Sequence, residues 1–215
     1  MIEVRAMKLS ALRDKEEFLY SEASCRRREK AARFVHTDDR LRCLAAGFLL
    51  KHQLPGYAEA LLYTGADGKP FLKNGTAFSL SHGGDYIVLA WCEDAEGIGV
   101  DVEPIREMEY YRAILPFAMA EREIKAVGES GREAVRIWTR KESLYKCVGE
   151  GVSDLRELPE VLAERMWFLG KPCLLTSWEE DGHSFSVALR APAPENARAC
   201  PSGADRQIKM RIHSV

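Results

Sequence analysis

Residues 77–103 read AFSLSHGGDYIVLAWCEDAEGIGVDVE and contain three short apolar runs with polar residues between them. The runs, residues 77–81, 86–92 and 97–103, are rich in β-branched and aromatic side chains, as strands are. The links between the runs are shorter than the roughly dozen residues that a parallel crossover needs. The stretch therefore predicts three strands in an antiparallel arrangement.

Helical patterns flank these strands on both sides. Upstream, residues 26–51 predict two helices with a break just before Thr37, and Thr37 or Asp38 is the expected N-cap of the second helix. Downstream, residues 120–127 and 132–148 predict a short and a long helix, each followed by a glycine that ends it.

Residues 161–190 then return to strand patterns, so helices followed by strands occur twice along the chain. This order predicts an α+β fold, sandwich-like, made of two similar α/β halves, residues 1–104 and 105–190. Residues 191–215 are rich in Pro and Ala and then basic. We expect them to form a flexible tail outside the fold.

The composition narrows the class of protein. The 215 residues contain 31 Lys+Arg and 33 Asp+Glu, and this balance argues against a nucleic-acid partner. No apolar run approaches the roughly 20 residues of a membrane helix, and the N-terminal sequence has no secretory pattern. The 6 cysteines are scattered, and we expect reduced thiols rather than disulfides. We therefore expect a cytoplasmic protein without a membrane partner.

Two acidic residues end the third strand pattern. Asp101 and Glu103 are two positions apart, so both side chains leave the same face of a strand. Adjacent carboxylates raise each other's pKa unless a cation joins them, and Mg²⁺ binds a few carboxylates together with phosphate oxygens. The small and apolar residues before Asp101 indicate a strand that is buried up to its acidic end. A buried strand of this kind favours a metal site. A solvated strand edge is the alternative.

A second charged pair lies in residues 138–146, WTRKESLYK, within the long predicted helix. Glu142 and Lys146 are four positions apart and share a helix face. Alone, they would form an ordinary surface ion pair. Combined with Asp101 and Glu103, they would form a Mg²⁺ clamp for phosphoryl-type transfer. Neither pattern is specific alone, whereas the combination is.

Two further patterns suit a phosphate. Residues 81–84, SHGG, end a strand with a hydroxyl, an imidazole and turn amides, and Arg26–Arg33 carries a run of cations. Each has a structural alternative, because a lone histidine is usually structural and a charge run is usually a solvated face. The sequence contains no Walker A loop, dinucleotide fingerprint, nucleophile elbow or zinc spacing.

In these residues the chain resembles the Sfp-type 4′-phosphopantetheinyl transferases. Residues 99–103 and 138–146 are similar to the family's G-x-D-x-E and W-x-x-K-E-S-x-x-K signatures in order and separation. Residues 68–70 (GKP), residues 78–83 (FSLSHG) and the basic helix are similar to further family elements. The resemblance covers roughly residues 25–155.

The resemblance implies a role for each matching residue. Three acidic residues would bind Mg²⁺, namely Asp101, Glu103 and Glu142. The remaining residues would bind coenzyme A: Lys146 at its pyrophosphate, Arg27, Lys30, Ser81 and His82 at its 3′-phosphate, Lys69 and Pro70 at its adenine, and Arg42 in the cationic wall. Cys43 stands where many relatives have a hydroxyl, and Ser79 where they have Asn.

The implied reaction moves the 4′-phosphopantetheine arm of coenzyme A onto a serine of an apo acyl or peptidyl carrier protein and releases adenosine 3′,5′-bisphosphate. Asp101, Glu142 and Lys146 would be catalytic. A serine hydroxyl needs a base, for which Glu142 is the first candidate, with Glu121 or a water as alternatives. The implied fold has two halves related by pseudo-two-fold symmetry with the active site in the cleft between them, so a monomer suffices.

Two other functions stay open at this point. A Mg²⁺-dependent nucleotide phosphohydrolase would share the carboxylates but would not need the Ser81-His82 pair, Lys69 and the basic helix together. A non-catalytic coenzyme A-binding relative would have lost at least one metal carboxylate, and all three are present. Carrier domains are typically acidic, so we expect docking at basic or apolar residues around 105–116.

Overall fold

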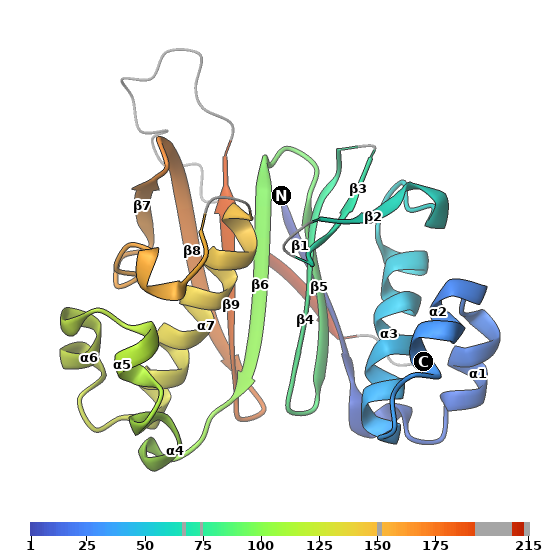
Figure 1. Cartoon of the computed structure of the whole chain (residues 1–215), viewed down its shortest axis with the longest axis horizontal. Coiled ribbons are helices and arrows are strands. Elements are labelled where there is room, and N and C mark those ends of the chain that lie inside the picture. The colour runs from blue at the N-terminus through green and yellow to red at the C-terminus, as the bar shows by residue number, and fades with distance from the viewer. Residues whose placement is uncertain (66–67, 74, 150–151, 192–207, 213–215) are drawn as a thin grey trace.

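The computed structural model describes residues 1–65, 68–73, 75–149, 152–191 and 208–212, and Figure 1 shows the arrangement of the chain. It is a mixed α/β molecule in which strands form the middle and helices cover both flanks. Two four-stranded sheets have the orders β10-β1-β5-β4 and β6-β9-β8-β7, and β2 and β3 form a small hairpin. Within the described ranges, no helix has the length and apolar content needed to cross a membrane.

The first sheet and its helices come mainly from the first part of the chain. Their bounds are β1 Ile2–Lys8, η1 Leu9–Leu12, α1 Glu16–Glu22, α2 Cys25–Ala31, α3 Thr37–Gln53, η2 Glu59–Leu61, β2 Leu62–Thr64, β3 Pro70–Leu72, β4 Ala77–Gly83 and β5 Tyr86–Cys92. All of β5 is buried, because Ile87, Leu89 and Trp91 pack in one core cluster with α3 while alternate residues pack in another. This explains why β5 is a continuous apolar run.

The second sheet is covered by the helices that follow β6. Their bounds are β6 Gly97–Pro104, α4 Met108–Arg112, α5 Leu115–Ala118, α6 Glu121–Val127, α7 Gly131–Val148, η3 Leu155–Glu157, β7 Arg165–Phe168, β8 Lys171–Glu180 and β9 His183–Arg190. The core between α7 and this sheet includes Val135, Leu144, Leu175 and Ala188.

The two sheets meet where β4 lies beside β6 (Figure 1). The Val100 N–H donates to Ser79 Oγ at 3.1 Å, and a Cβ atom on Gly83 would lie 2.0 Å from the Val102 carbonyl oxygen. Only glycine permits so close a backbone approach. The contact brings the Ser81 end of β4 to the acidic end of β6.

Most predicted elements are confirmed. The three strands of residues 77–103 are β4, β5 and β6, the two upstream helices are α2 and α3, and the downstream helices end at Gly128 and Gly149. The expected N-cap of α3 is wrong by one or two positions, because His36 is the N-cap and provides no side-chain hydrogen bond. Cys25, Cys43, Cys147 and Cys173 are free cysteines in the structure, and Cys200 lies outside the described residues.

Two assignments need correction. Only β4 and β5 pair antiparallel within residues 77–103, while β6 pairs with β9. The sheets therefore divide between β5 and β6, and residues 97–104 belong with the second sheet rather than with the first half. The tail is also wrong for Ile208–Ile212, which forms β10 and pairs parallel with β1. Its sequence, IKMRI, alternates apolar and basic residues as a strand does, and β1 offers it a sheet edge.

Candidate active site

One cavity of about 720 Å³ contains nearly all the residues that the sequence predicts for the site. Its lining combines four acidic side chains, the fourth being Asp39, with a set of cations. The predicted residues that line it are Arg27, Lys30, Arg42, Pro70, Ser81, His82, Asp101, Glu103, Glu142 and Lys146. Residues from α2, α3, β4, β6 and α7 therefore converge, although they lie far apart in the sequence.

Strand β6 presents its acidic residues to the cavity by simple alternation. Ile98, Val100 and Val102 are buried in the core cluster between the two sheets. Their neighbours Asp101 and Glu103 leave the opposite face and line the cavity. The strand is buried up to its acidic end, as the sequence predicts.

Helix α7 contributes three residues at four-residue spacing. Trp138, Glu142 and Lys146 line the cavity and lie along one helix face. The side chains between them turn inward, where Thr139, Arg140 and Ser143 are buried. Trp138 is a site residue whose role the sequence did not predict, although its spacing from Glu142 was the signal that could have found it.

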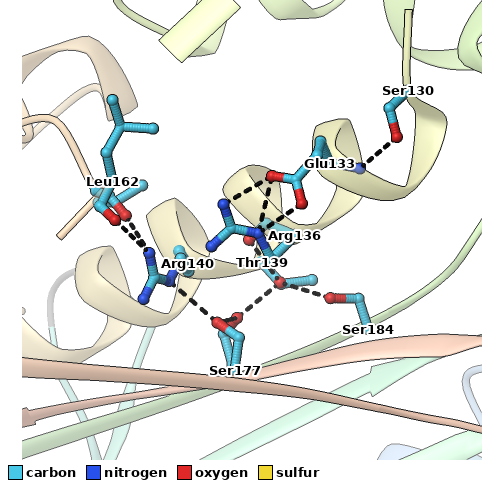
Figure 2. Close-up of polar contacts among 10 residues, drawn as sticks. Ser130, Glu133, Arg136, Thr139, Arg140, Leu162, Ser177 and Ser184 are labelled. Carbon is cyan, nitrogen blue, oxygen red and sulfur yellow. Dashed lines mark hydrogen bonds and ion pairs between the residues drawn. The ribbon is translucent and has the colours of Figure 1, made fainter. Parts of the chain in front are cut away.

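The buried polar residues of α7 fix the helix on its sheet, as Figure 2 shows. Thr139 Oγ1 lies 2.8 Å from Ser186 Oγ, and Arg140 Nε donates to Ser177 Oγ at 3.1 Å. Arg140 Nη1 also donates to the Val161 carbonyl at 2.6 Å. These bonds set the position of α7 and hence that of Glu142 and Lys146.

Gly99 allows α7 to pack directly on β6. A Cβ atom at this position would lie 1.9 Å from the Ser143 carbonyl oxygen and 2.6 Å from the Cys147 nitrogen. Both are backbone atoms, so a side chain could be accommodated only by moving the helix. The glycine two residues before Asp101 is therefore explained by helix packing.

We expect Gly99→Ala to lower the free energy of unfolding by about 1–3 kcal/mol, as overpacking does, and to lower turnover because Glu142 and Lys146 move away from β6. Urea unfolding and carrier-labelling rates measure the two effects. Gly47→Ala is the control for stability. Gly47 lies inside α3, and a methyl group there would meet only the flexible side chain of Arg27 from α2. Unchanged stability and turnover in Gly99→Ala would contradict the packing argument.

Lys146 and Asp101 form the centre of the site. Lys146 Nζ lies 2.6 Å from Asp101 Oδ1 and 3.1 Å from Ser81 Oγ, and Ser81 Oγ donates to Asp101 Oδ1 at 2.8 Å. Asp101 is almost fully buried, whereas Lys146 is partly exposed to the cavity. The ammonium compensates one oxygen of the buried carboxylate, and the Ser81 hydroxyl is already engaged by these two groups.

Burial and neighbouring negative charge raise the pKa of two acidic residues of the site, Glu103 and Glu142. Burial raises the pKa of Glu103 from 4.5 to about 7, and the charge of Asp101 adds to this effect. Burial and then the charge of Asp101 also raise the pKa of Glu142. Lys146 opposes the rise at both residues. Around Asp101, three carboxylates thus face one ammonium, that of Lys146, which is the electrostatic setting of a cation site.

The donor chemistry fits a hard divalent cation. Asp101 Oδ2 is buried without a hydrogen-bond partner, and oxygen atoms of carboxylates are the ligands that Mg²⁺ takes. In the part of the chain that is described, no three acidic, histidine or cysteine side chains are already close enough to hold a metal ion. The other oxygen of this carboxylate, Asp101 Oδ1, is paired with the ammonium of Lys146.

Several cations from α2 and α3 also line the cavity, and we call this part of the lining its cationic end. Arg27, Lys30, Arg42 and His82 line it. Arg42 donates to Asp39 Oδ1 at 2.9 Å and to the Gly84 carbonyl at 3.2 Å, while its buried Nε has no partner. Loss of solvent and then the positive charges of Arg42 and Lys146 lower the pKa of His82. This end suits an anion with several charges, such as a phosphate.

The structure does not bring two predicted residues to the cavity. Lys69 is absent from its lining, and its ammonium donates to the carbonyl oxygens of Ile98 and Lys146, behind the site. Glu121, the alternative base, is exposed at the start of α6 and also lies outside the lining. Neither position is fixed by a local pattern, because both depend on how distant segments pack.

Comparison with known proteins identifies the family. Residues 97–186 match the model of the 4′-phosphopantetheinyl transferase superfamily. The chain is 37% identical over 158 residues to the 4′-phosphopantetheinyl transferase AcpT of Salmonella typhi, covering 70% of this chain and 76% of the relative. This chain belongs to the 4′-phosphopantetheinyl transferase family.

Two further transferases of the family extend the likeness over most of the chain. The chain is 28% identical to the 4′-phosphopantetheinyl transferase psf-1 of Bacillus pumilus, over 89% of this chain and 91% of the relative. It is also 28% identical to the 4′-phosphopantetheinyl transferase Sfp of Bacillus subtilis (strain 168), over 83% and 87%. The match to the family model begins at Gly97, the first residue of β6, and includes all of α7, so it contains Asp101, Glu103 and Glu142.

Proposed function

We propose that this chain transfers the 4′-phosphopantetheine arm of coenzyme A to a serine of an apo acyl or peptidyl carrier protein, with Mg²⁺, and releases adenosine 3′,5′-bisphosphate. The observation that supports it is a single cavity whose lining combines Asp101, Glu103, Glu142 and Lys146 with the cations of α2 and α3. Coenzyme A has phosphates in two places, a pyrophosphate and a 3′-phosphate, and the cavity has a cationic region for each.

The cations are assigned by their position in the cavity. Arg27, Lys30, Arg42 and His82 would bind the 3′-phosphate end, and Pro70 would lie against the adenine. Ser81 would act indirectly, because its hydroxyl holds Asp101 and Lys146. Lys146 would meet the pyrophosphate with its ammonium, which lies beside the carboxylates.

Asp101, Glu103 and Glu142 would hold Mg²⁺. The bound ion supplies positive charge that stabilises the pyrophosphate and the bisphosphate that leaves. Glu142 is the proposed base for the carrier serine, since its carboxylate lines the cavity beside Asp101 and Lys146. Lys146 stabilises negative charge at the reacting phosphate.

The two-half architecture is part of this proposal. Each half would consist of a sheet backed by helices, with the cavity lined by residues of both, and the similarity of the halves would express a pseudo-two-fold relation. We put the boundary between the halves between β5 and β6, because these strands belong to different sheets. One chain supplies both sides of the cavity, so a monomer is the proposed active form.

Intact-mass measurement of an apo carrier protein tests the function directly. The carrier is incubated with this protein, coenzyme A and Mg²⁺, with EDTA as the control. A gain of one phosphopantetheine arm that EDTA abolishes supports the reaction, the donor and the metal together. Release of adenosine 3′,5′-bisphosphate without carrier labelling would favour a phosphohydrolase. Calorimetry that finds no coenzyme A binding would overturn the proposal.

The raised pKa of Glu103 predicts a pH-dependent stability. Its folded pKa of about 7 exceeds its ordinary 4.5, so the metal-free fold binds this proton more tightly than the unfolded chain does. The contribution of Glu103 to stability is therefore lost as pH rises from 4.5 towards 7. In EDTA, we expect Glu103→Gln to gain up to about 3 kcal/mol over wild type between pH 5 and pH 8. Urea unfolding of both proteins at the two pH values measures this.

The same two proteins are also compared with Mg²⁺ in place of EDTA. At pH 8 Mg²⁺ should raise the melting temperature of wild type more than that of Glu103→Gln, because binding needs the deprotonated carboxylate. A difference between the two proteins that does not vary with pH would contradict the assignment of the titration to Glu103.

Residues 105–116 are the proposed contact for the carrier. Arg106 lies over the ring of Tyr110 with its guanidinium carbon 4.5 Å from the ring centroid, and Tyr110 is exposed. A small pocket in this region shares Glu103 and Trp138 with the cavity. Arg106 and Tyr110 thus present a cation and an aromatic ring beside Glu103 and Trp138.

We expect Arg106→Glu to raise the KM for an acidic carrier by about tenfold, because reversing a charge at a charged interface weakens association, and to leave the KM for coenzyme A unchanged. Arg13→Glu is the control, since Arg13 is an exposed arginine at the end of η1. Steady-state kinetics with varied carrier measure the change. Equal carrier KM values in both variants would exclude this segment from docking.

A further inference from the structure

The turn between β8 and β9 touches the turn between β4 and β5, and both lie at the lower end of the molecule in Figure 1. His183, the first residue of β9, joins them. The Asp85 N–H donates to His183 Nε2 at 3.2 Å, and His183 Nδ1 lies 2.8 Å from the Asp181 carbonyl oxygen. A backbone N–H can only donate, so Nε2 is the acceptor and Nδ1 carries the hydrogen. Both ring nitrogens are therefore used.

The same turn holds a cation of the cavity. Gly84 has a φ of +51° and packs against the imidazole, and a Cβ atom there would lie 2.2 Å from His183 Nε2. The Gly84 carbonyl accepts a hydrogen bond from Arg42 Nη2 at 3.2 Å. Arg42 lines the cationic end of the cavity, as does His82, two residues before Gly84. A continuous set of contacts thus runs from β9 through the turn to the cavity.

The acidic side chains of these two turns make hydrogen bonds with other parts of the first sheet and with η1. Asp85 accepts from the Ser10 N–H at 2.7 Å and from the Ser10 hydroxyl at 2.6 Å. Asp181 accepts from Tyr86 Oη at 3.0 Å and from Lys8 Nζ at 2.5 Å. His183 differs from these groups because it accepts the N–H of the Gly84–Asp85 peptide unit, and the carbonyl of the same unit accepts from Arg42.

We propose that His183 is a positioning residue for the phosphate-binding end of the cavity. The proposal rests on the function proposed above and adds to it a residue that does not line the cavity. His183 acts through the Gly84 and Asp85 backbone on Arg42. Without its acceptor nitrogen, the Asp85 N–H loses its partner, and the Gly84 carbonyl no longer holds Arg42 in place. The loss should weaken coenzyme A binding and spare the reacting groups at Asp101 and Lys146.

Two substitutions distinguish the role of the Nε2 acceptor of His183 from that of its aromatic ring. His183→Phe keeps an aromatic ring against Tyr86, whose centroid lies 5.0 Å from the imidazole, and removes both nitrogens. His183→Gln loses the ring but can place an amide oxygen near the position of Nε2. Coenzyme A binding is measured by calorimetry, and KM and kcat by carrier labelling. Melting temperatures of both variants report general loss of stability.

We expect His183→Phe to raise the Kd and KM for coenzyme A about threefold to tenfold, as the loss of one hydrogen bond predicts, with kcat within about twofold of wild type. His183→Gln should restore Kd and KM to within about twofold, even where its melting temperature falls. Equal KM values in the two variants, or a change confined to kcat, would overturn the positioning role alone. Absence of coenzyme A binding by wild type would overturn the proposed function as well.

Discussion

Asp101→Asn is expected to lower turnover by at least about a hundredfold, and up to a thousandfold, while the protein stays folded. The substitution keeps the shape of the side chain and removes its charge. Asp101 Oδ1 accepts from both Lys146 and Ser81, and its other oxygen is buried without a partner. The neutral amide would leave the Lys146 ammonium without its counterion and would remove one proposed ligand of Mg²⁺. Single-turnover carrier labelling measures the rate.

Ser79→Ala is the matched control for this prediction. Ser79 is buried on β4, accepts from the Val100 N–H at 3.1 Å and does not line the cavity. Its loss should lower stability by about 1 kcal/mol and keep turnover near wild type. If Asp101→Asn retained more than about a tenth of wild-type turnover, Asp101 would not belong to the reacting groups.

The second large effect is expected on stability, at an ion pair that the sequence did not predict. Lys141 Nζ lies 3.0 Å from Glu123 Oε2, and the two side chains are 1% and 0% exposed. Glu123 also accepts the backbone N–H groups of Ala120 at 2.8 Å and Val161 at 2.7 Å. Glu123→Leu should therefore lower the free energy of unfolding by about 3–5 kcal/mol, because the buried Lys141 ammonium loses its counterion and the N–H groups of Ala120 and Val161 lose their acceptor.

A surface pair on the same helix provides the comparison. Arg136 and Glu133 are joined at 2.7 Å, three positions apart and partly exposed. Arg136→Ala should cost no more than about 1 kcal/mol. Adding Lys141→Met to Glu123→Leu should recover part of the loss, since it removes the unpaired charge. Urea unfolding of the four proteins measures all of this. A cost for Glu123→Leu no greater than that of Arg136→Ala would contradict the buried-pair argument.

The residues that the sequence predicts well are those whose position follows from a local repeat. Asp101 and Glu103 lie on one face because a strand alternates, and Glu142 and Lys146 lie on one face because a helix turns every 3.6 residues. The ends of α6 and α7 follow from Gly128 and Gly149, which adopt the positive φ values of 54° and 65° that glycine permits.

The features that the sequence did not predict depend on contacts between distant segments. The pairing of β6 with β9, and of β10 with β1, joins strands whose partners lie far away in the chain. Lys69 turns to carbonyl oxygens behind the site. Lys141 belongs to the motif that resembles the family signature, but its ammonium pairs with Glu123. This partner follows from the position of Lys141 on the buried side of α7, which the motif alone does not indicate.

The contact of β4 with β6 makes the site a seam between two separately built sheets. The cations of α2 and α3 stand on one side of this seam and the carboxylates of β6 and α7 on the other. A ligand bound by residues from both sides connects the two sheets, and its binding free energy adds to the free energy of unfolding. Resistance to unfolding will then rise with the concentration of coenzyme A, so the seam becomes strongest when the substrate is abundant.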